Sequence, residues 1–181
     1  MQAIQYAANT PCEDTYCSHQ LLINDKNLGY YNAVFDGHGG WQLAEYAINY
    51  LHTYIEEKLK EIMKKKGELN DDDYKKAIEY GFDRVEEDFL NFSREGFKKG
   101  FPRTAYVGAC ALVTVVAGNK VYIASAGDCK AAIIRANGDN YEAIKVNKRF
   151  TANKKSEQQR LAKEFPTDKD IVVCVSYNHK I

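Results

Sequence analysis

The sequence predicts a protein of the α+β class, with antiparallel strands beside two long helices. Two amphipathic helical patterns follow one another, over residues 41–66 and from residue 71 onward. Short apolar segments come after them, separated by tight-turn dipeptides such as Gly118-Asn119. A run of hairpins after a helical pair is typical of the α+β class.

Composition excludes several classes of function. The 181 residues contain 25 Lys and Arg against 25 Asp and Glu, so no net charge directs the chain to nucleic acid or to a membrane surface. The length fits a single domain over 1–181, and neither a bilayer-spanning apolar run nor an Arg-rich, acid-poor leader is expected. The default prediction is a cytoplasmic protein, with the mitochondrial matrix as the alternative.

The 5 cysteines indicate reduced thiols. Their number is odd, and no two of them form a C-x-x-C pair. Neither a disulfide framework nor a zinc site is therefore expected.

Short strands are predicted at the start of the chain. Residues 4–8 and 15–23 have strand composition, and the turn between them carries two adjacent acids, Glu13 and Asp14. Residues 24–29 have the composition of a hairpin loop and lead into the next strand. Glu13 and Asp14 are therefore expected at the end of the sheet where that next strand finishes.

The stretch around residue 36 is the most informative. Residues 30–35 are aromatic and β-branched, which predicts a buried strand, and Asp36 is the first polar residue after it. Gly37 and the glycines at 39 and 40 allow a sharp turn and a close approach to whatever Asp36 holds. A carboxylate, His38 and three glycines at a strand-to-helix junction make a compact place for a hard cation.

Two antiparallel helices are predicted next. The pattern over 41–66 has apolar residues at steps of three and four, and it ends in a lysine cluster before Gly67, as the helix dipole favours. Asn70 and the three aspartates after it start the second helix. A basic loop punctuated by Gly and Pro is expected over 96–103.

The rest of the chain is predicted to be mainly strand. Strands joined by tight turns are expected over 106–117, 120–126, 130–136 and 141–146. A short helix over 156–165 is stopped by Pro166, and a last strand is expected over 171–175.

These motifs resemble the metal-dependent, type 2C protein phosphatases. The order and spacing of that family are matched by Glu13-Asp14, Asp36-Gly37-His38-Gly39-Gly40, Gly108-Ala109-Cys110-Ala111 and Ala126-Gly127-Asp128-Cys129-Lys130-Ala131. The resemblance covers nearly the whole chain. The branch that contains pyruvate dehydrogenase phosphatase is the most similar in Asn9-x-Pro11-x-Glu13-Asp14 and in the helix ending Lys163-Glu164-Phe165-Pro166.

The resemblance implies a fold and a site. The fold is a sandwich of two antiparallel sheets flanked by antiparallel helix pairs, which this chain would form without its C-terminal strands. The site holds two Mg²⁺ or Mn²⁺ ions: Asp36 bridges them, the Gly37 carbonyl adds a ligand, and Glu13 and Asp14 hold metal-bound waters. His38 is the candidate general acid for the leaving seryl or threonyl oxygen.

Structural alternatives exist for these residues. Asp36 could cap the following helix, and Glu13 and Asp14 could be ordinary turn residues. For Asp128, a turn role is favoured over a metal role. The family usually has an Asp-His pair where this chain has Lys148-Arg149-Phe150, and a cation there should repel a further metal ion.

Two functions from different classes follow from the resemblance. The first is a serine/threonine phosphatase that hydrolyses a phosphoprotein through a metal-activated water. The second is a pseudophosphatase that acts as a binding or structural subunit, because the family's further metal-binding aspartates fall beyond Ile181. The missing strands also predict a protein partner that covers the incomplete sandwich.

Overall fold

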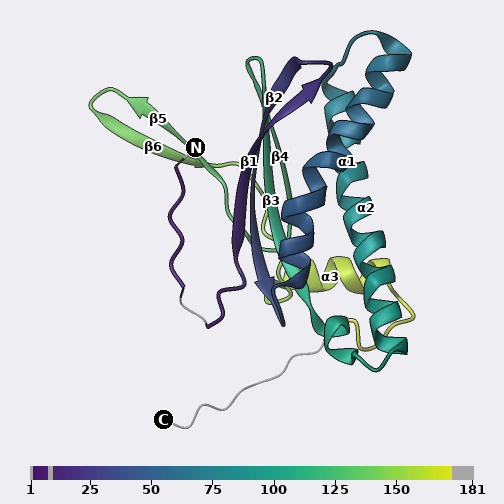
Figure 1. The fold of residues 1–181 in the computed structure, drawn as a ribbon. Coiled ribbons are helices and arrows are strands. Elements are labelled where there is room, and N and C mark those ends of the chain that lie inside the picture. The colour runs from purple at the N-terminus through teal and green to yellow at the C-terminus, as the bar shows by residue number, and fades with distance from the viewer. Residues whose placement is uncertain (1, 8–9, 173–181) are drawn as a thin grey trace.

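The structure is a computed structural model that describes residues 2–7 and 10–172. Its elements are, in chain order, β1 (Thr15–Ile23), β2 (Lys26–His38), α1 (Gln42–Lys66), α2 (Asp71–Lys98), the 3₁₀ helix η1 (Pro102–Tyr106), β3 (Gly108–Ala117), β4 (Lys120–Ala126), β5 (Ala132–Asn137), β6 (Asn140–Lys145) and α3 (Lys155–Glu164). Strands β1 to β4 form one antiparallel sheet in that order. Helices α1 and α2 lie along one face of this sheet, and the β5–β6 hairpin projects away from them (Figure 1).

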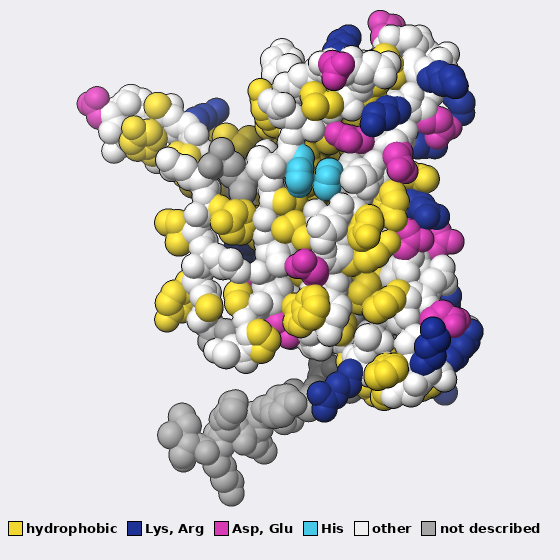
Figure 2. Space-filling view, in the orientation of Figure 1, with side chains coloured by type: hydrophobic (Ala, Val, Ile, Leu, Met, Phe, Trp, Pro, Cys, Tyr) yellow, Lys and Arg dark blue, Asp and Glu magenta, His cyan; other side chains and the backbone are white. Residues whose placement is uncertain are grey.

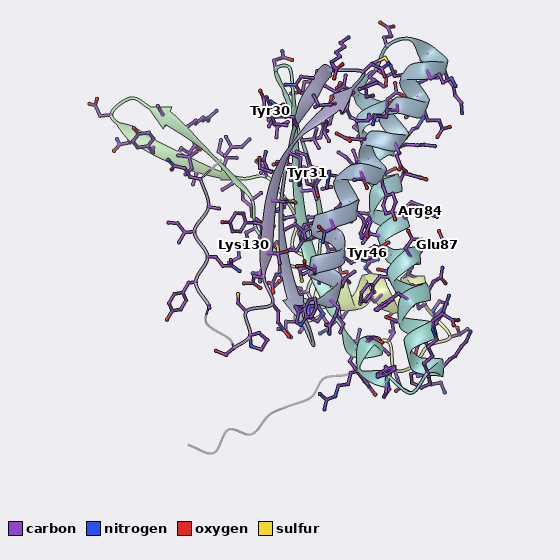
Figure 3. All side chains as sticks on the ribbon, in the orientation of Figure 1. Tyr30, Tyr31, Tyr46, Arg84, Glu87 and Lys130 are labelled. Atoms are coloured by element: carbon purple, nitrogen blue, oxygen red, sulfur yellow. The ribbon has the colours of Figure 1, made fainter. Side chains whose placement is uncertain are left out.

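The four-stranded sheet is apolar on the face that meets the helices. In β2, Tyr31 is fully buried, whereas its neighbour Tyr30 is 49% exposed on the opposite face (both labelled in Figure 3). Successive side chains of a strand point to opposite faces, so the same alternation buries Val113 and Val115 of β3. One face therefore builds the core with α1 and α2, and the other carries the polar residues of the candidate site.

The end of α1 and the start of α2 form as the sequence predicts. Helix α1 is followed by Gly67, whose φ of 81° lies in the left-handed region. Helix α2 begins with a capping box, in which the Asn70 side chain accepts from the Asp73 N–H and the Asp73 side chain accepts from the Asn70 N–H. Asp73 also pairs with Lys66 at 2.5 Å, which joins the two helices at this end.

Gly81 lets α2 approach α1 closely. A Cβ at this position would lie 2.8 Å from Ile55 Cγ1 and 3.1 Å from Leu51 Cδ1. The Gly81→Leu substitution is expected to lower the free energy of unfolding by about 1–3 kcal/mol, because the larger side chain overpacks this contact. Urea denaturation measures the effect. The exposed Glu79→Leu control in the same helix should change stability by less than about 0.5 kcal/mol, and equal effects of the two would contradict the close approach.

Several predicted boundaries need correction. Residues 4–7 are not in a strand, and residue 8 lies outside the described part of the chain. Helix α2 extends to Lys98, so the first residues of the expected loop over 96–103 are helical. Residues 171–172 form a bend, and the remainder of the expected strand over 171–175 lies outside the described residues.

The α+β class is confirmed. The described residues form a four-stranded sheet and a separate two-stranded one, the exposed β5–β6 hairpin, which does not pack over the larger sheet as a second layer (Figure 1). On the open face of the larger sheet, several apolar side chains are exposed: Tyr16, Tyr30, Val34, Val116 and Val121. Within the described part of the chain, no helix is long and apolar enough to cross a membrane.

Candidate metal centre

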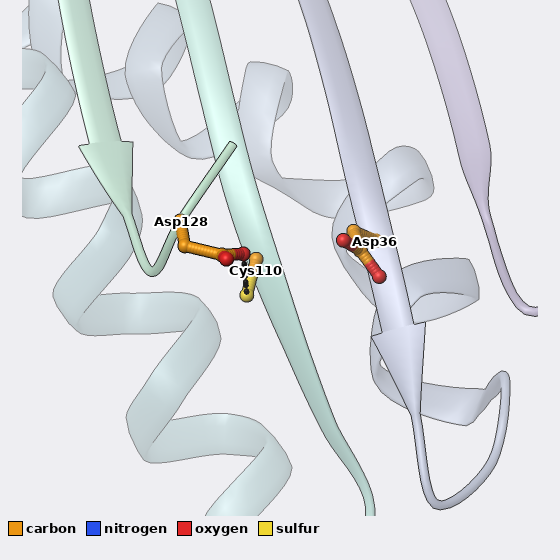
Figure 4. A group of neighbouring side chains, drawn as sticks. All are labelled: Asp36, Cys110 and Asp128. Atoms are coloured by element: carbon orange, nitrogen blue, oxygen red, sulfur yellow. Dashed lines mark hydrogen bonds between the residues drawn. The ribbon is translucent and has the colours of Figure 1, made fainter. Parts of the chain in front are cut away.

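The candidate site is built on the open face of the sheet, near the end of β2. Asp36 is directly opposite Cys110 of β3 in the antiparallel register. Asp128 follows in the bend after β4, the next strand of the sheet. One oxygen or sulfur atom from each of the three side chains lies within 4.8 Å of the others (Figure 4). The sheet order thus brings together three potential ligands from separate parts of the sequence.

The electrostatics around Asp36 favour a cation. The pKa of Asp36 is raised, first by desolvation and then by the negative charges of Asp14 and Asp128, while His38 acts in the opposite direction. Ionised carboxylates at this spacing repel one another, and a bound divalent ion would relieve that repulsion. The residues present therefore fit a metal ion that takes oxygen ligands.

Glu13 and Asp14 reach this end of the sheet as the sequence predicts. Thr15 is opposite Phe35 in the register, so the next residues on the two chains are Asp14 and Asp36. A Cβ on Gly37 would overlap the Glu13 carbonyl oxygen, which shows that the backbone before β1 passes directly against Gly37. Glycine is required here because the two chain segments leave no room for a side chain.

His38 lies two residues after Asp36 on the same exposed face of β2. It pairs with Gly108 in the register, and a Cβ on Gly108 would overlap the His38 imidazole at Nε2. Gly39, with φ of 71°, then turns the chain toward α1. The imidazole is thus held beside the carboxylates.

The two cysteines near the carboxylates are protonated thiols at neutral pH. Burial raises the pKa of the Cys129 thiol to about 11 and also raises the pKa of Cys110. Cys110 Sγ lies 3.8 Å from Asp128 Oδ1. Cys12 and Cys17 are free thiols as well, and Cys174 lies outside the described residues. Because a thiol binds metal as the thiolate, the ligand set here is dominated by oxygen, which suits Mg²⁺ or Mn²⁺ better than zinc.

Comparison with known proteins identifies the family. A family model described as Protein phosphatase 2C matches residues 5–167. The chain belongs to the protein phosphatase 2C family. Two Arabidopsis thaliana members, Probable protein phosphatase 2C 42 and Probable protein phosphatase 2C 67, are both 30% identical to it, over 167 and 170 residues. The alignments cover 92% of this chain but only 40% and 43% of these relatives, so it spans less than half of their length.

Solved structures support the phosphatase 2C fold. The crystal structure of the serine-threonine phosphatase 2C from Toxoplasma gondii superimposes with a TM-score of 0.64 at 11% identity, covering 83% of this chain and 54% of that one. A C. elegans sex determining protein gives a TM-score of 0.59 at 17% identity, covering 84% of this chain and 34% of the other. The resemblance to the family is therefore confirmed, whereas the finer likeness to the pyruvate dehydrogenase phosphatase branch stays a prediction.

Arg149 adds a cation to the candidate site. Its guanidinium donates to Asp128 twice, from Nη2 to Oδ2 at 2.7 Å and from Nε to the backbone carbonyl at 3.0 Å. The first of these bonds is the main reason that the pKa of the Asp128 carboxyl is lowered. Any metal ion at Asp36 and Asp128 must therefore compete with this guanidinium for the Asp128 carboxylate.

The Arg149→Gln substitution is expected to tighten Mn²⁺ binding by up to about fivefold, because the ion pair with Asp128 is partly exposed to water and contributes little. Isothermal titration calorimetry measures the affinity. The matched control is Lys148→Gln, which removes the same charge from an exposed side chain that lies over the Phe150 ring. Equal tightening by both variants would show that only net charge matters and would contradict a specific competition at Asp128.

Proposed function

We propose that this chain forms part of a metal-dependent serine/threonine phosphatase that hydrolyses phosphate esters on proteins. The observation that carries the proposal is the gathering of carboxylates around Asp36, with His38 on the same strand face. Family membership supports it independently.

The chain's own oxygen atoms would hold one or two Mg²⁺ or Mn²⁺ ions. Asp36 and the Gly37 carbonyl are proposed as direct ligands, and Glu13 and Asp14 as residues that hold water around the ions. Asp128 is added as a further candidate ligand, because it neighbours Asp36 in space. When bound, such ions neutralise a phosphate group and make a water molecule sufficiently acidic to attack phosphorus.

His38 is proposed as the general acid. The leaving group in this reaction is a seryl or threonyl oxygen, which is a poor leaving group unless it receives a proton. The imidazole is exposed and packs on Gly108, so it is positioned by the sheet and accessible to a substrate. The expected role is donation of one proton from the imidazole to the departing oxygen.

The direct test is hydrolysis of p-nitrophenyl phosphate in the presence of Mn²⁺. It is run on the 181-residue chain and on the chain as its gene encodes it, if the reading frame continues past Ile181. Turnover that depends on Mn²⁺ and on His38 in either chain supports the proposal. Absence of Mn²⁺-dependent turnover in both contradicts it and leaves the alternative of a binding or structural subunit.

A further inference from the structure

Two histidines stack where the edge strand meets the first helix. The rings of His19 on β1 and His52 on α1 have centroids 3.8 Å apart and planes inclined by only 7°. The pair is visible as two neighbouring histidine side chains on the surface over β1 and α1 (Figure 2). Tyr31 of β2 lies against both, at 6.2 Å from His19 and 6.0 Å from His52. The stack therefore forms part of the contact between the sheet and α1.

Its surroundings are poor in groups that could stabilise positive charge. On the β2 side, the fully buried Tyr31 hydroxyl has no hydrogen-bond partner among the described residues, so it makes no hydrogen bond to either imidazole. On the α1 side, the one acidic group acting on His52 is Glu56. Its carboxylate already accepts from the Leu22 N–H at 2.9 Å and lies 4.0 Å from Lys60 Nζ. Little negative charge is left to offset a second imidazolium.

The stacked geometry favours proton chemistry over metal binding. The imidazole lone pairs lie in the ring planes, and nearly parallel planes do not direct both nitrogens at one ion. Two imidazolium rings at this separation would instead repel each other strongly.

We propose that the His19–His52 stack is a pH-sensitive latch between β1 and α1, closed while the imidazoles are neutral and released when both are protonated. This inference does not depend on phosphatase activity. It concerns how firmly the edge strand is held to the rest of the molecule.

The sign of the effect follows from the environment of His52. Burial, and next the neighbouring His19, lower the pKa of His52 below its ordinary value of 6.5, whereas Glu56 and the Ile48 carbonyl act in the opposite direction. The folded state therefore prefers the neutral His52 ring. The contribution of His52 to the free energy of unfolding is fully present above pH 6.5. Stability is lost as the pH falls from 6.5 through the lowered pKa of the folded state.

The latch has a consequence for the candidate metal centre. Among the described strands, β1 pairs with β2 alone, and it continues directly from Glu13 and Asp14. Loosening β1 would therefore free these two acids from their place beside Asp36. That consequence, unlike the latch itself, rests on the proposed function.

Hydrogen exchange of the full 181-residue chain, followed by mass spectrometry at about pH 7.5, 6.5 and 5.5 without added metal, tests the latch. After correction for intrinsic exchange rates, exchange in the β1 peptide should accelerate by about tenfold per pH unit below 6.5 for each proton taken up on opening. The peptide covering β3 should stay protected. The variants His52→Gln and His19→Gln should each remove the pH dependence in β1.

The matched control is His38→Gln, which changes a histidine outside the stack and should keep the pH-dependent exchange of β1. Three outcomes would overturn the proposal. They are a β1 exchange that does not depend on pH after correction, a dependence that survives in both stack variants, and an equal loss of protection in β3, which would indicate global unfolding. Having two variants on different elements keeps the test valid if one of them folds poorly.

Discussion

The Asp36→Asn variant is expected to lose Mn²⁺-dependent hydrolysis of p-nitrophenyl phosphate by about 10³-fold or more, since a metal centre contributes several kcal/mol to stabilising the transition state. Asp36 is the residue on which the candidate ligands converge, so the amide should also abolish any rise in melting temperature on adding Mn²⁺. Initial-rate measurements and thermal denaturation with and without the ion check both effects.

Without metal, the same substitution should make the chain slightly more stable at neutral pH. The raised pKa of Asp36 means that the folded state binds its proton more tightly than the unfolded state does. The favourable contribution of this group is therefore present below its unfolded pKa, and it is lost as the pH rises through the folded value. An amide has no such dependence.

The matched control for Asp36→Asn is Asp139→Asn, which removes the same charge from the turn of the β5–β6 hairpin, where the hairpin projects away from the four-stranded sheet (Figure 1). It should leave both hydrolysis and the Mn²⁺ effect unchanged. Full activity in the Asp36 variant, or the same loss in the control, would contradict the assignment of Asp36 as a metal ligand.

The Phe35→Ala variant is expected to lower the free energy of unfolding by about 3–5 kcal/mol, the range for deleting a buried aromatic ring. Phe35 immediately precedes Asp36 in β2, and its side chain is completely buried between the sheet and α1. Its loss would leave a cavity directly behind the candidate site. Chemical denaturation at constant pH measures the change.

Val34→Ala provides the comparison for that result. Val34 is adjacent in β2, but its side chain is 46% exposed on the opposite face. The Val34→Ala substitution should lower the free energy of unfolding by less than about 1 kcal/mol, because little apolar area is removed from the core. Similar losses in the two variants would show that the alternation of buried and open faces is wrong.

Local patterns were sufficient to predict most of the fold. The strand before Asp36 and both long helices follow from periodicity, and the start of α2 follows from Asn70 and the acids after it. The strand predicted over residues 4–8 was wrong for residues 4–7, because a strand also needs a neighbouring strand to pair with, and composition does not supply one. The end of α2 was placed too early because Gly96 indicated a loop, although the helix continues through it to Lys98.

The candidate site was predicted only in part. Glu13, Asp14 and Asp36 could be placed together because one hairpin connects their strands. Cys110 and Asp128 could not, because their proximity to Asp36 depends on the pairing of β2 with β3, which are separated in the sequence by the two long helices. The sequence did indicate that Lys148-Arg149 places a cation where the family has a carboxylate, but not that Arg149 would pair with Asp128.

Paramagnetic broadening by Mn²⁺ tests most directly whether acidic oxygens around Asp36 bind a divalent ion. In an amide NMR spectrum of the assigned chain, substoichiometric Mn²⁺ should broaden signals around Asp14, Asp36 and Asp128 first. The rival location is the acidic first turn of α2, where Asp71 pairs with Lys120 at the opposite end of β4. Broadening centred on Asp71, or no localised broadening at all, would contradict a metal centre at Asp36.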